Sequence, residues 1–215
     1  AMDVLIYVPA TAAGPVPFFW GLNFQGNHTV SADPGILMPR PPEESAGAPR
    51  PKPLKAFVRG DQADRWQIEW VVSQGYGTAT AWYEDIDPDF DDGFKNGVHG
   101  LFPDIEAKRE GTTWGSLAAW AWGLRAGMDY LEMEPWCDAR QVALHGHSRL
   151  GKATLWAGAQ DERFDVVISN NSGCGGAALS KRCFGETVGR INTSFPHWFA
   201  GNFKQWNGRE AEMPY

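Results

Sequence analysis

Apolar segments of about strand length occur at five places along the chain, separated by polar or periodic stretches. Near-continuous apolar runs of this kind predict strands, of the type that is covered on both faces of a sheet. The chain also shows helical spacing in three segments between these runs. The predicted strands are 3–8, 17–23, 76–83, 141–145 and 166–169.

The three helical segments have recognisable ends. A helix with Asp61 as its N-cap is predicted to end at Gly75, with Trp66, Trp70 and Val71 on one side. The strongest helix is predicted to start at Thr112 or Thr113 and to stop before Pro135, and a third spans 149–159. The apolar residues of the strongest helix recur every three or four positions, at Trp114, Leu117, Ala118, Ala121, Leu124, Met128 and Leu131.

Strands that alternate with helices of these lengths predict an α/β fold with a mainly parallel sheet. The length of 215 residues suits a single domain spanning 1–215. Within it, residues 30–56 lose all periodicity and hold seven of the fifteen prolines. A stretch of this length without a pattern predicts an excursion over the surface.

Five aspartates lie between Asp85 and Gly93, which suggests calcium binding at first sight. The EF-hand register fails, however. Counted from Asp85, the sixth position is Phe90 where the motif needs glycine, and counted from Asp87, the twelfth is Val98 where it needs glutamate. We therefore expect a solvated acidic loop and no metal site.

Composition and charge exclude several classes of partner. The chain is 43% hydrophobic and 21% charged, which is typical of a globular domain, and its net charge is −7. This charge argues against nucleic acid and against an electrostatically held membrane surface as partners. The apolar run from Val4 to Val8 is too short to span a bilayer, and no basic leader precedes it, so we expect no signal peptide in these residues.

The cysteines fit neither a disulfide framework nor a Cys-x-x-Cys pair, so we expect buried neutral thiols at Cys137, Cys174 and Cys183. The eleven tryptophans are expected mostly in the core. Carbohydrate-binding clefts also use aromatic faces, so the number slightly favours a sugar ligand.

The segment 141–152, Gln-Val-Ala-Leu-His-Gly-His-Ser-Arg-Leu-Gly-Lys, carries the clearest chemical signal. An apolar strand runs into Gly146-His147-Ser148 and a helix starts at once. A serine on such a turn faces the N-terminus of the helix, whose free N–H groups can receive a developing oxyanion. The match to G-x-S-x-G is imperfect because Leu150 stands in place of the second glycine. Taken alone, the pattern is equally compatible with Ser148 as an ordinary N-cap.

Two cations favour the catalytic interpretation. Arg149 and Lys152 lie in the first turn of the predicted helix, where the helix dipole disfavours positive charge. Local conflicts of this kind often mark functional sites. Lys152 follows Ser148 by four residues and can share its helix face, although an exposed lysine on the helix surface is the simpler alternative.

Gly-His-Ser-Arg-Leu-Gly-Lys at 146–152 resembles the Gly-Cys-Ser-Arg-x-Gly-Lys signature of glucuronoyl esterases, carbohydrate esterase family 15. The resemblance covers essentially the whole chain and is to the bacterial branch. It includes the segments 21–29, 85–94, 118–123, 156–164, 169–177 and 195–199.

The resemblance implies an α/β-hydrolase fold, a three-layer sandwich, and cleavage of the ester between 4-O-methyl-glucuronic acid of xylan and lignin alcohols, without metal or cofactor. It implies Ser148 as the nucleophile and Arg149 as the stabiliser of the oxyanion. It also implies that Lys152 and Glu186 bind the sugar hydroxyls. An extracellular or periplasmic location is implied only by the resemblance and by the polymeric substrate.

The family's triad acid and histidine are not found at the expected places. Asn170-Asn171-Ser172 stands where some members place the acid, and an amide cannot orient an imidazolium by charge. Of the five histidines only His197 follows Ser148, within a segment that does not resemble the catalytic loop, so we expect none of them to be the base. His28 and His99 are expected to be structural or to line the cleft.

We therefore expect the domain to be incomplete at its C-terminal edge. The strand 166–169 would otherwise be an exposed apolar edge, and a missing C-terminal segment is expected to pack on it. Two alternatives remain open: a general carboxylesterase or acetyl esterase of the same fold, and a catalytically inactive fragment that keeps the cleft.

Overall fold

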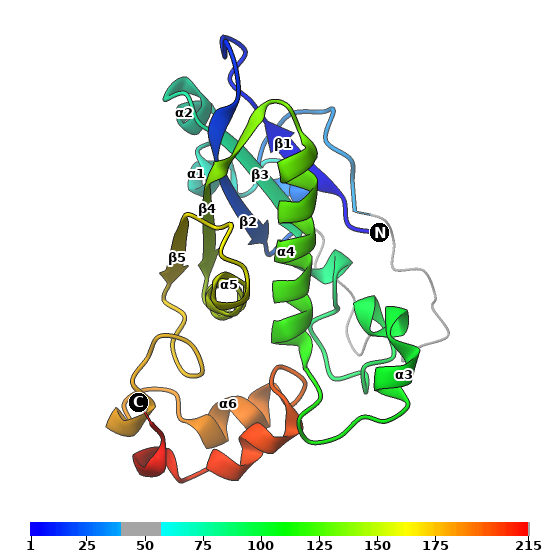
Figure 1. The fold of residues 1–215 in the computed structure, drawn as a ribbon, viewed down its shortest axis with the longest axis vertical. Helices are drawn as coiled ribbons and strands as arrows, with labels where there is room; N and C mark the ends of the chain where they lie inside the picture. Colours follow the sequence, from blue (N-terminus) through cyan, green and yellow to red (C-terminus); the bar gives the residue numbers. More distant parts are fainter. Residues whose placement is uncertain (40–56, 215) are drawn as a thin grey trace.

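The computed structural model describes residues 1–39 and 57–214, and its centre is a five-stranded sheet (Figure 1). The strand order is β1-β3-β2-β4-β5. Strands β2, β3, β4 and β5 run parallel, and β1 pairs antiparallel with β3. The prediction of an α/β fold with a mainly parallel sheet is therefore confirmed. The strands are β1 (Val4–Tyr7), β2 (Val16–Asn23), β3 (Gly77–Trp82), β4 (Cys137–His147) and β5 (Val166–Asn170).

The two long helices, α4 (Ser116–Met133) and α5 (Arg149–Gln160), cover one face of the sheet and lie side by side in Figure 1. The α-helices are α1 (Ala63–Trp66), α2 (Ile68–Ser73), α3 (Pro103–Glu106), α4 (Ser116–Met133), α5 (Arg149–Gln160) and α6 (Val188–Ser194). Short 3-10 helices span Asn27–Thr29, Tyr83–Asp85, Gly97–Leu101, Ser180–Arg182, Gly201–Trp206 and Glu210–Glu212.

The main core lies between the sheet and helix α4. Trp20 of β2 is fully buried, and its indole N–H donates to the carbonyl of Leu124 at 2.8 Å. Gly127 permits this approach, since a Cβ there would lie 2.2 Å from the indole ring. The apolar side of the periodic helix is buried as predicted, with Leu124, Met128 and Leu131 almost fully inaccessible.

The opposite face of the sheet is covered in part by the short helices. The imidazole of His145 on β4 lies against Gly21 of β2, where a Cβ would come within 2.8 Å of the ring. Trp66 of α1 packs on the same imidazole, with ring centroids 5.6 Å apart. Helical cover on both faces agrees with the expected three-layer arrangement.

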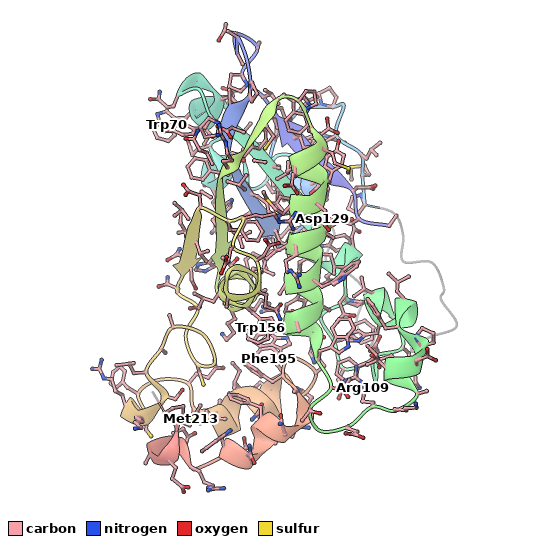
Figure 2. The ribbon with its side chains drawn as sticks, viewed as in Figure 1. Trp70, Arg109, Asp129, Trp156, Phe195 and Met213 are labelled. Carbon is pink, nitrogen blue, oxygen red and sulfur yellow. The ribbon has the colours of Figure 1, made fainter. Side chains whose placement is uncertain are left out.

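The helix predicted over 61–75 is broken into α1 and α2 at Gln67, which has φ 47°. Asp61 is not its N-cap. Its carboxylate instead accepts from the N–H of Val58. Trp70 was predicted on the buried side but is 63% exposed and points outward from α2 (Figure 2).

Two other boundaries differ from the sequence-based expectations. Helix α4 begins after Gly115, not at Thr112 or Thr113, and the N–H groups of its first two residues, Ser116 and Leu117, donate to the carbonyls of His197 and Trp198. Strand β4 starts at Cys137 and is longer than predicted. Most of the proline-rich excursion predicted at 30–56 lies outside the described residues.

Strand β5 lies at the edge of the described sheet, where it pairs with β4 alone. Val166, Val167 and Ile168 are 47%, 37% and 43% exposed. This edge is therefore as apolar as the sequence predicted.

The cysteines are free thiols, but only two are buried as expected. Burial raises the pKa of Cys137 to about 11 and also raises the pKa of Cys174. Cys183 is exposed, because it follows a short 3-10 helix in a surface loop.

Candidate active site

Ser148 lies on the turn between β4 and α5, at the carboxyl ends of the parallel strands. Its backbone has φ 56° and ψ −125°, a combination that costs a non-glycine residue about 1–3 kcal/mol. The N–H of Ser148 donates to the carbonyl of Asn170 at 2.9 Å, which ties the turn to the end of β5. The side chain makes no capping bond to the helix, so the ordinary N-cap interpretation is wrong.

Gly146 provides the space that this turn requires. A Cβ at position 146 would lie 2.4 Å from the carbonyl oxygen of Leu150 and 2.4 Å from Oγ1 of Thr154. The first turn of α5 therefore folds back directly over the end of β4. This arrangement places Ser148 beside first-turn N–H groups that have no acceptor within the helix.

Arg149 is the first residue of α5, and its side chain turns toward the loop after β3. One guanidinium nitrogen, Nη1, donates to Oδ2 of Asp89. The guanidinium carbon lies 4.9 Å from the Trp198 ring centroid and 5.5 Å from that of Phe195. Figure 2 shows Phe195 where the C-terminal segment meets the body of the protein.

Lys152 is buried one helical turn further along α5, with 7% of its surface exposed. Its ammonium group donates to the carbonyl of Ser172 at 2.6 Å and lies 5.6 Å from the Trp198 ring centroid. Burial lowers the pKa of Lys152, and the negative charge of Glu186 opposes this shift. The alternative of an exposed surface lysine is therefore wrong.

Glu186 lies in the exposed loop before α6. Its charge acts on both Lys152 and Cys174, which places this carboxylate on the same side of the molecule as the buried ammonium. Three of the four predicted site residues, Ser148, Arg149 and Lys152, thus come from one turn and one helix. Glu186 reaches the same region from the C-terminal segment.

The acidic loop 85–93 is not solvated as predicted. The Asp89 side chain is only 3% exposed, and Asp87 and Asp92 are also buried. Asp92 accepts from the N–H groups of Phe94 and Asn96 and so closes a turn. The loop is buried at these three aspartates because it packs between α4 and the C-terminal segment, where their carboxylates find donors, whereas Asp91 is exposed.

Asp89 accepts four hydrogen bonds from side chains of four other residues. Its partners are Arg149, Trp198 at 2.7 Å, His197 at 3.0 Å and Tyr83 at 3.0 Å. Burial alone would raise the pKa of Asp89, but the bond from His197, the charge of Arg149 and the bond from Trp198 hold it at about 2. The carboxylate is therefore ionised at every ordinary working pH.

A second buried cluster, formed by Asp87, His99 and Glu106, ties the acidic loop to residues that follow it in the sequence. His99 is fully buried, and its Nδ1 lies 3.1 Å from Oε1 of Glu106 while Nε2 lies 3.7 Å from Oδ1 of Asp87. Burial alone would lower the pKa of His99, but these two carboxylates raise it. The structural role expected of His99 agrees with this position. In residues 1–39 and 57–214, no group of three or more histidine, cysteine or acidic side chains is placed to hold a metal ion.

Trp198 also lines an apolar pocket of about 520 Å³. The pocket lies between α4 and α5, and its aromatic lining includes Trp114, Trp122, Trp156 and Phe199. Some tryptophans thus lie in the core, as Trp20 does, others line this pocket, and Trp70 is exposed. No helix in the described part of the chain is long and apolar enough to cross a membrane.

Sequence reasoning missed Asp89 and Trp198 as the partners of Arg149, and it missed His197 as a further partner of Asp89. The relevant signal was present in the acidic loop, where Ile86, Phe90 and Phe94 alternate with the aspartates. A loop with this many large apolar residues must bury them, and its carboxylates are buried with them.

Comparison with known proteins places these features in a family. The sequence matches the family described as "Glucuronyl esterase, fungi" over residues 67–215. It is 50% identical to carbohydrate esterase MZ0003 from an unknown prokaryotic organism, over all of this chain and 50% of that protein. Among solved structures, a glucuronoyl esterase from Solibacter usitatus is 51% identical, with a TM-score of 0.88 over 100% of this chain and 54% of that one.

A second solved structure is described as a promiscuous CE15 esterase from a marine bacterial metagenome. It is 48% identical with a TM-score of 0.82, over 99% of this chain and 54% of that one. The chain thus spans about half the length of these relatives. The chain belongs to the glucuronoyl esterases of carbohydrate esterase family 15.

Proposed function

We propose that the protein carrying this chain is a serine esterase that cleaves the ester between 4-O-methyl-glucuronic acid of glucuronoxylan and a lignin alcohol. The membership of the chain in the glucuronoyl esterase family supports this substrate class. A polymeric plant substrate lies outside the cytoplasm, so we place the enzyme in the periplasm or the extracellular space.

One observation carries the proposal: the strained backbone of Ser148 between β4 and the N-terminus of α5. A strained residue persists only where the surrounding structure fixes it, and such residues gather at active sites. Here the turn leaves the serine side chain out of the helix cap and places Arg149 immediately after it. This combination matches the needs of a nucleophile that generates an oxyanion.

In the proposed reaction, Oγ of Ser148 forms a bond to the C6 carbonyl carbon of the uronate ester. The negative charge on the carbonyl oxygen is stabilised by Arg149 and by N–H groups of the first turn of α5. The ester bond then breaks, and the alcohol leaves with the proton that the serine gave up to a histidine base. Water hydrolyses the acyl-enzyme to glucuronate by the same route.

The family resemblance implies that this histidine and its acid lie beyond the segments that the chain shares with its relatives. None of the described histidines is assigned the role, because only His197 follows Ser148 in the sequence and its imidazole is buried beside Asp89.

Lys152 and Glu186 are proposed to bind the sugar hydroxyls. Among the described residues, the ammonium of Lys152 donates one hydrogen bond, to the carbonyl of Ser172. An ammonium has three donors, so two remain for a ligand. The carboxylate of Glu186 supplies an acceptor on the same side.

Hydrolysis of benzyl glucuronate by the protein that carries these residues tests the proposal. Ser148→Ala is expected to reduce the rate by at least about 10³-fold, because it removes the nucleophile. Ser73→Ala, which removes an exposed hydroxyl on α2, is the matched control and is expected to keep the wild-type rate. Equal rates for Ser148→Ala and the wild type would remove Ser148 from the mechanism.

A broader carboxylesterase or acetyl esterase is the second candidate, and one observation favours it: a relative 48% identical to this chain is described as promiscuous. This candidate predicts fast hydrolysis of p-nitrophenyl acetate that is indifferent to the loss of Lys152. A glucuronate-specific enzyme instead loses sugar-ester hydrolysis in the same variant.

We also propose that further polypeptide packs on the exposed edge of β5, since Val166, Val167 and Ile168 would otherwise stay in solvent. The mass of the purified protein, measured by mass spectrometry, tests whether it contains residues in addition to these 215. Hydrogen exchange then tests the packing, with slow exchange of the outward β5 amides expected in the complete protein. Fast exchange there would contradict it. The 215 residues alone are expected to be inactive if they lack the base.

A further inference from the structure

The carboxylate of Asp89 is a buried junction between three segments that are distant in sequence. It bonds to Tyr83 after β3, to Arg149 at the start of α5, and to the pair His197 and Trp198 near the C-terminus. An ionised carboxylate accepts about four hydrogen bonds. Its four donors therefore fill its capacity and fix its orientation from all sides.

The two oxygens of Asp89 have different partners. Oδ1 accepts from the indole of Trp198 and lies near Nε2 of His197. Oδ2 accepts from Arg149 and from the hydroxyl of Tyr83. Burial, followed by the negative charge of Asp89, raises the pKa of Tyr83, so its hydroxyl stays a donor. The carboxylate is thus held by Trp198 and His197 at one oxygen and by Tyr83 at the other, and it presents a fixed anchor to the arginine.

The fixed Asp89 carboxylate restricts the conformation of the Arg149 side chain. A free arginine side chain has many rotamers, and fixing it in one of them costs conformational entropy. Here the guanidinium is bonded at Nη1 and flanked by the rings of Trp198 and Phe195. Its Nε is buried and, within the described residues, has no hydrogen-bond partner. The pairing with Asp89 thus leaves a fixed donor that lacks an acceptor.

We infer that Asp89 is a positioning residue of the esterase: it holds the guanidinium of Arg149 beside Ser148 so that the free donors of Arg149 meet the oxyanion. This inference rests on the proposed function. The negative charge of Asp89 partly offsets the positive charge of Arg149 at the oxyanion. However, donors that are fixed in place before the reaction need no reorganisation when charge develops. The effect therefore belongs to the transition state and not to substrate binding.

The first test compares two aspartates of the same loop. Asp89→Asn keeps the shape but removes the charge, and we expect kcat for benzyl glucuronate to fall about 10- to 100-fold with KM changed by less than about twofold. Asp91→Asn makes the same change at an exposed position and is expected to keep the wild-type kcat. A rise in KM at constant kcat, or an unchanged kcat in Asp89→Asn, would overturn the inference.

The second test separates positioning from a general loss of structure. If Asp89 acts through Arg149, then Asp89→Asn in an Arg149→Ala background should change kcat by less than about twofold. A purely structural role would lower kcat by the same factor in both backgrounds, and that result would contradict the inference.

The third test does not depend on activity. In protein labelled with ¹⁵N-arginine, the Nε–H signal of Arg149, assigned by its loss in Arg149→Lys, is expected to exchange slowly in the wild type and quickly in Asp89→Asn. If Asp89→Asn does not fold, Tyr83→Phe removes one donor to the same oxygen and should accelerate the exchange to a smaller degree. An Nε–H signal unchanged in the variant used would refute the inference. A wild-type rate in Ser148→Ala would refute only the proposed function.

Discussion

The ammonium group of Lys152 donates a hydrogen bond of 2.6 Å to the backbone carbonyl of Ser172. This bond joins the helix that follows Ser148 to the segment that follows β5. Because the same ammonium faces the Trp198 ring and is almost entirely buried, its position is fixed before any substrate binds. A fixed, partly desolvated cation is suited to select hydroxyl-rich ligands.

Replacing this lysine should separate sugar recognition from ester chemistry. Lys152→Met keeps most of the side-chain volume and removes the charged donors, so KM for benzyl glucuronate is expected to rise about tenfold. The kcat for p-nitrophenyl acetate, which has no sugar hydroxyls, should change by less than about threefold. Steady-state kinetics with both esters measure this, with Lys181→Met at an exposed site as the control. Parallel losses on both esters would contradict the assigned role.

Arg149→Ala should act on the chemical step. Removing one donor to a developing oxyanion typically lowers kcat by about 10²- to 10³-fold, and we expect a loss of this size with a small change in KM. Arg140→Ala serves as the control because the Arg140 side chain is 91% exposed on β4. If Arg149→Ala keeps the kcat of the wild type, Arg149 does not stabilise the oxyanion.

Gly146→Ala should damage the nucleophile turn itself. The added Cβ would meet backbone of Leu150 at 2.4 Å, and backbone cannot move aside without shifting the first turn of α5. We expect the free energy of unfolding to fall by about 3 kcal/mol, with esterase activity lost as well. Gly14→Ala, where nothing lies within 4 Å, provides the comparison in urea unfolding. A neutral effect at 146 would show that the turn is not so tightly packed.

Acid should destabilise the protein through His145. Burial lowers the pKa of this imidazole from 6.5 to about 4. Between these values the unfolded chain binds a proton that the folded protein does not. The free energy of unfolding should therefore decrease as the pH falls through this window, by about 3 kcal/mol in total.

Urea unfolding of the wild type and of His145→Gln, between about pH 4.5 and about pH 7, measures this contribution. The variant lacks the group, so its stability should depend less on pH in this range, while His99 and the other titrating groups affect both proteins alike. Identical pH dependence of the two proteins would contradict the assignment.

The local parts of the site could be predicted from sequence because their signals are local. The last part of strand β4, the glycine before the turn, Ser148 and the two cations of α5 lie within residues 141–152, and their order alone indicates an exposed nucleophile. The same holds for α4, whose apolar periodicity identifies the buried face correctly.

The partners of Asp89 could not be predicted in this way. Asp89 and Arg149 are 60 residues apart, and Asp89 and His197 are 108 apart, so their pairing exists only in the folded chain. The helix predicted over 61–75 failed for a related reason. Gln67 adopts a left-handed conformation, with φ 47°, that divides the helix, and Trp70 of the predicted buried side points outward.

Trapping the covalent intermediate tests the central claim most directly. The protein that carries these residues is mixed with benzyl glucuronate, quenched in acid within milliseconds and digested, and the peptides are analysed by mass spectrometry. We predict one glucuronoyl group, attached to the peptide at Ser148 and missing in Ser148→Ala. A glucuronoyl group on any other residue, or wild-type hydrolysis of the ester by Ser148→Ala, would contradict the account.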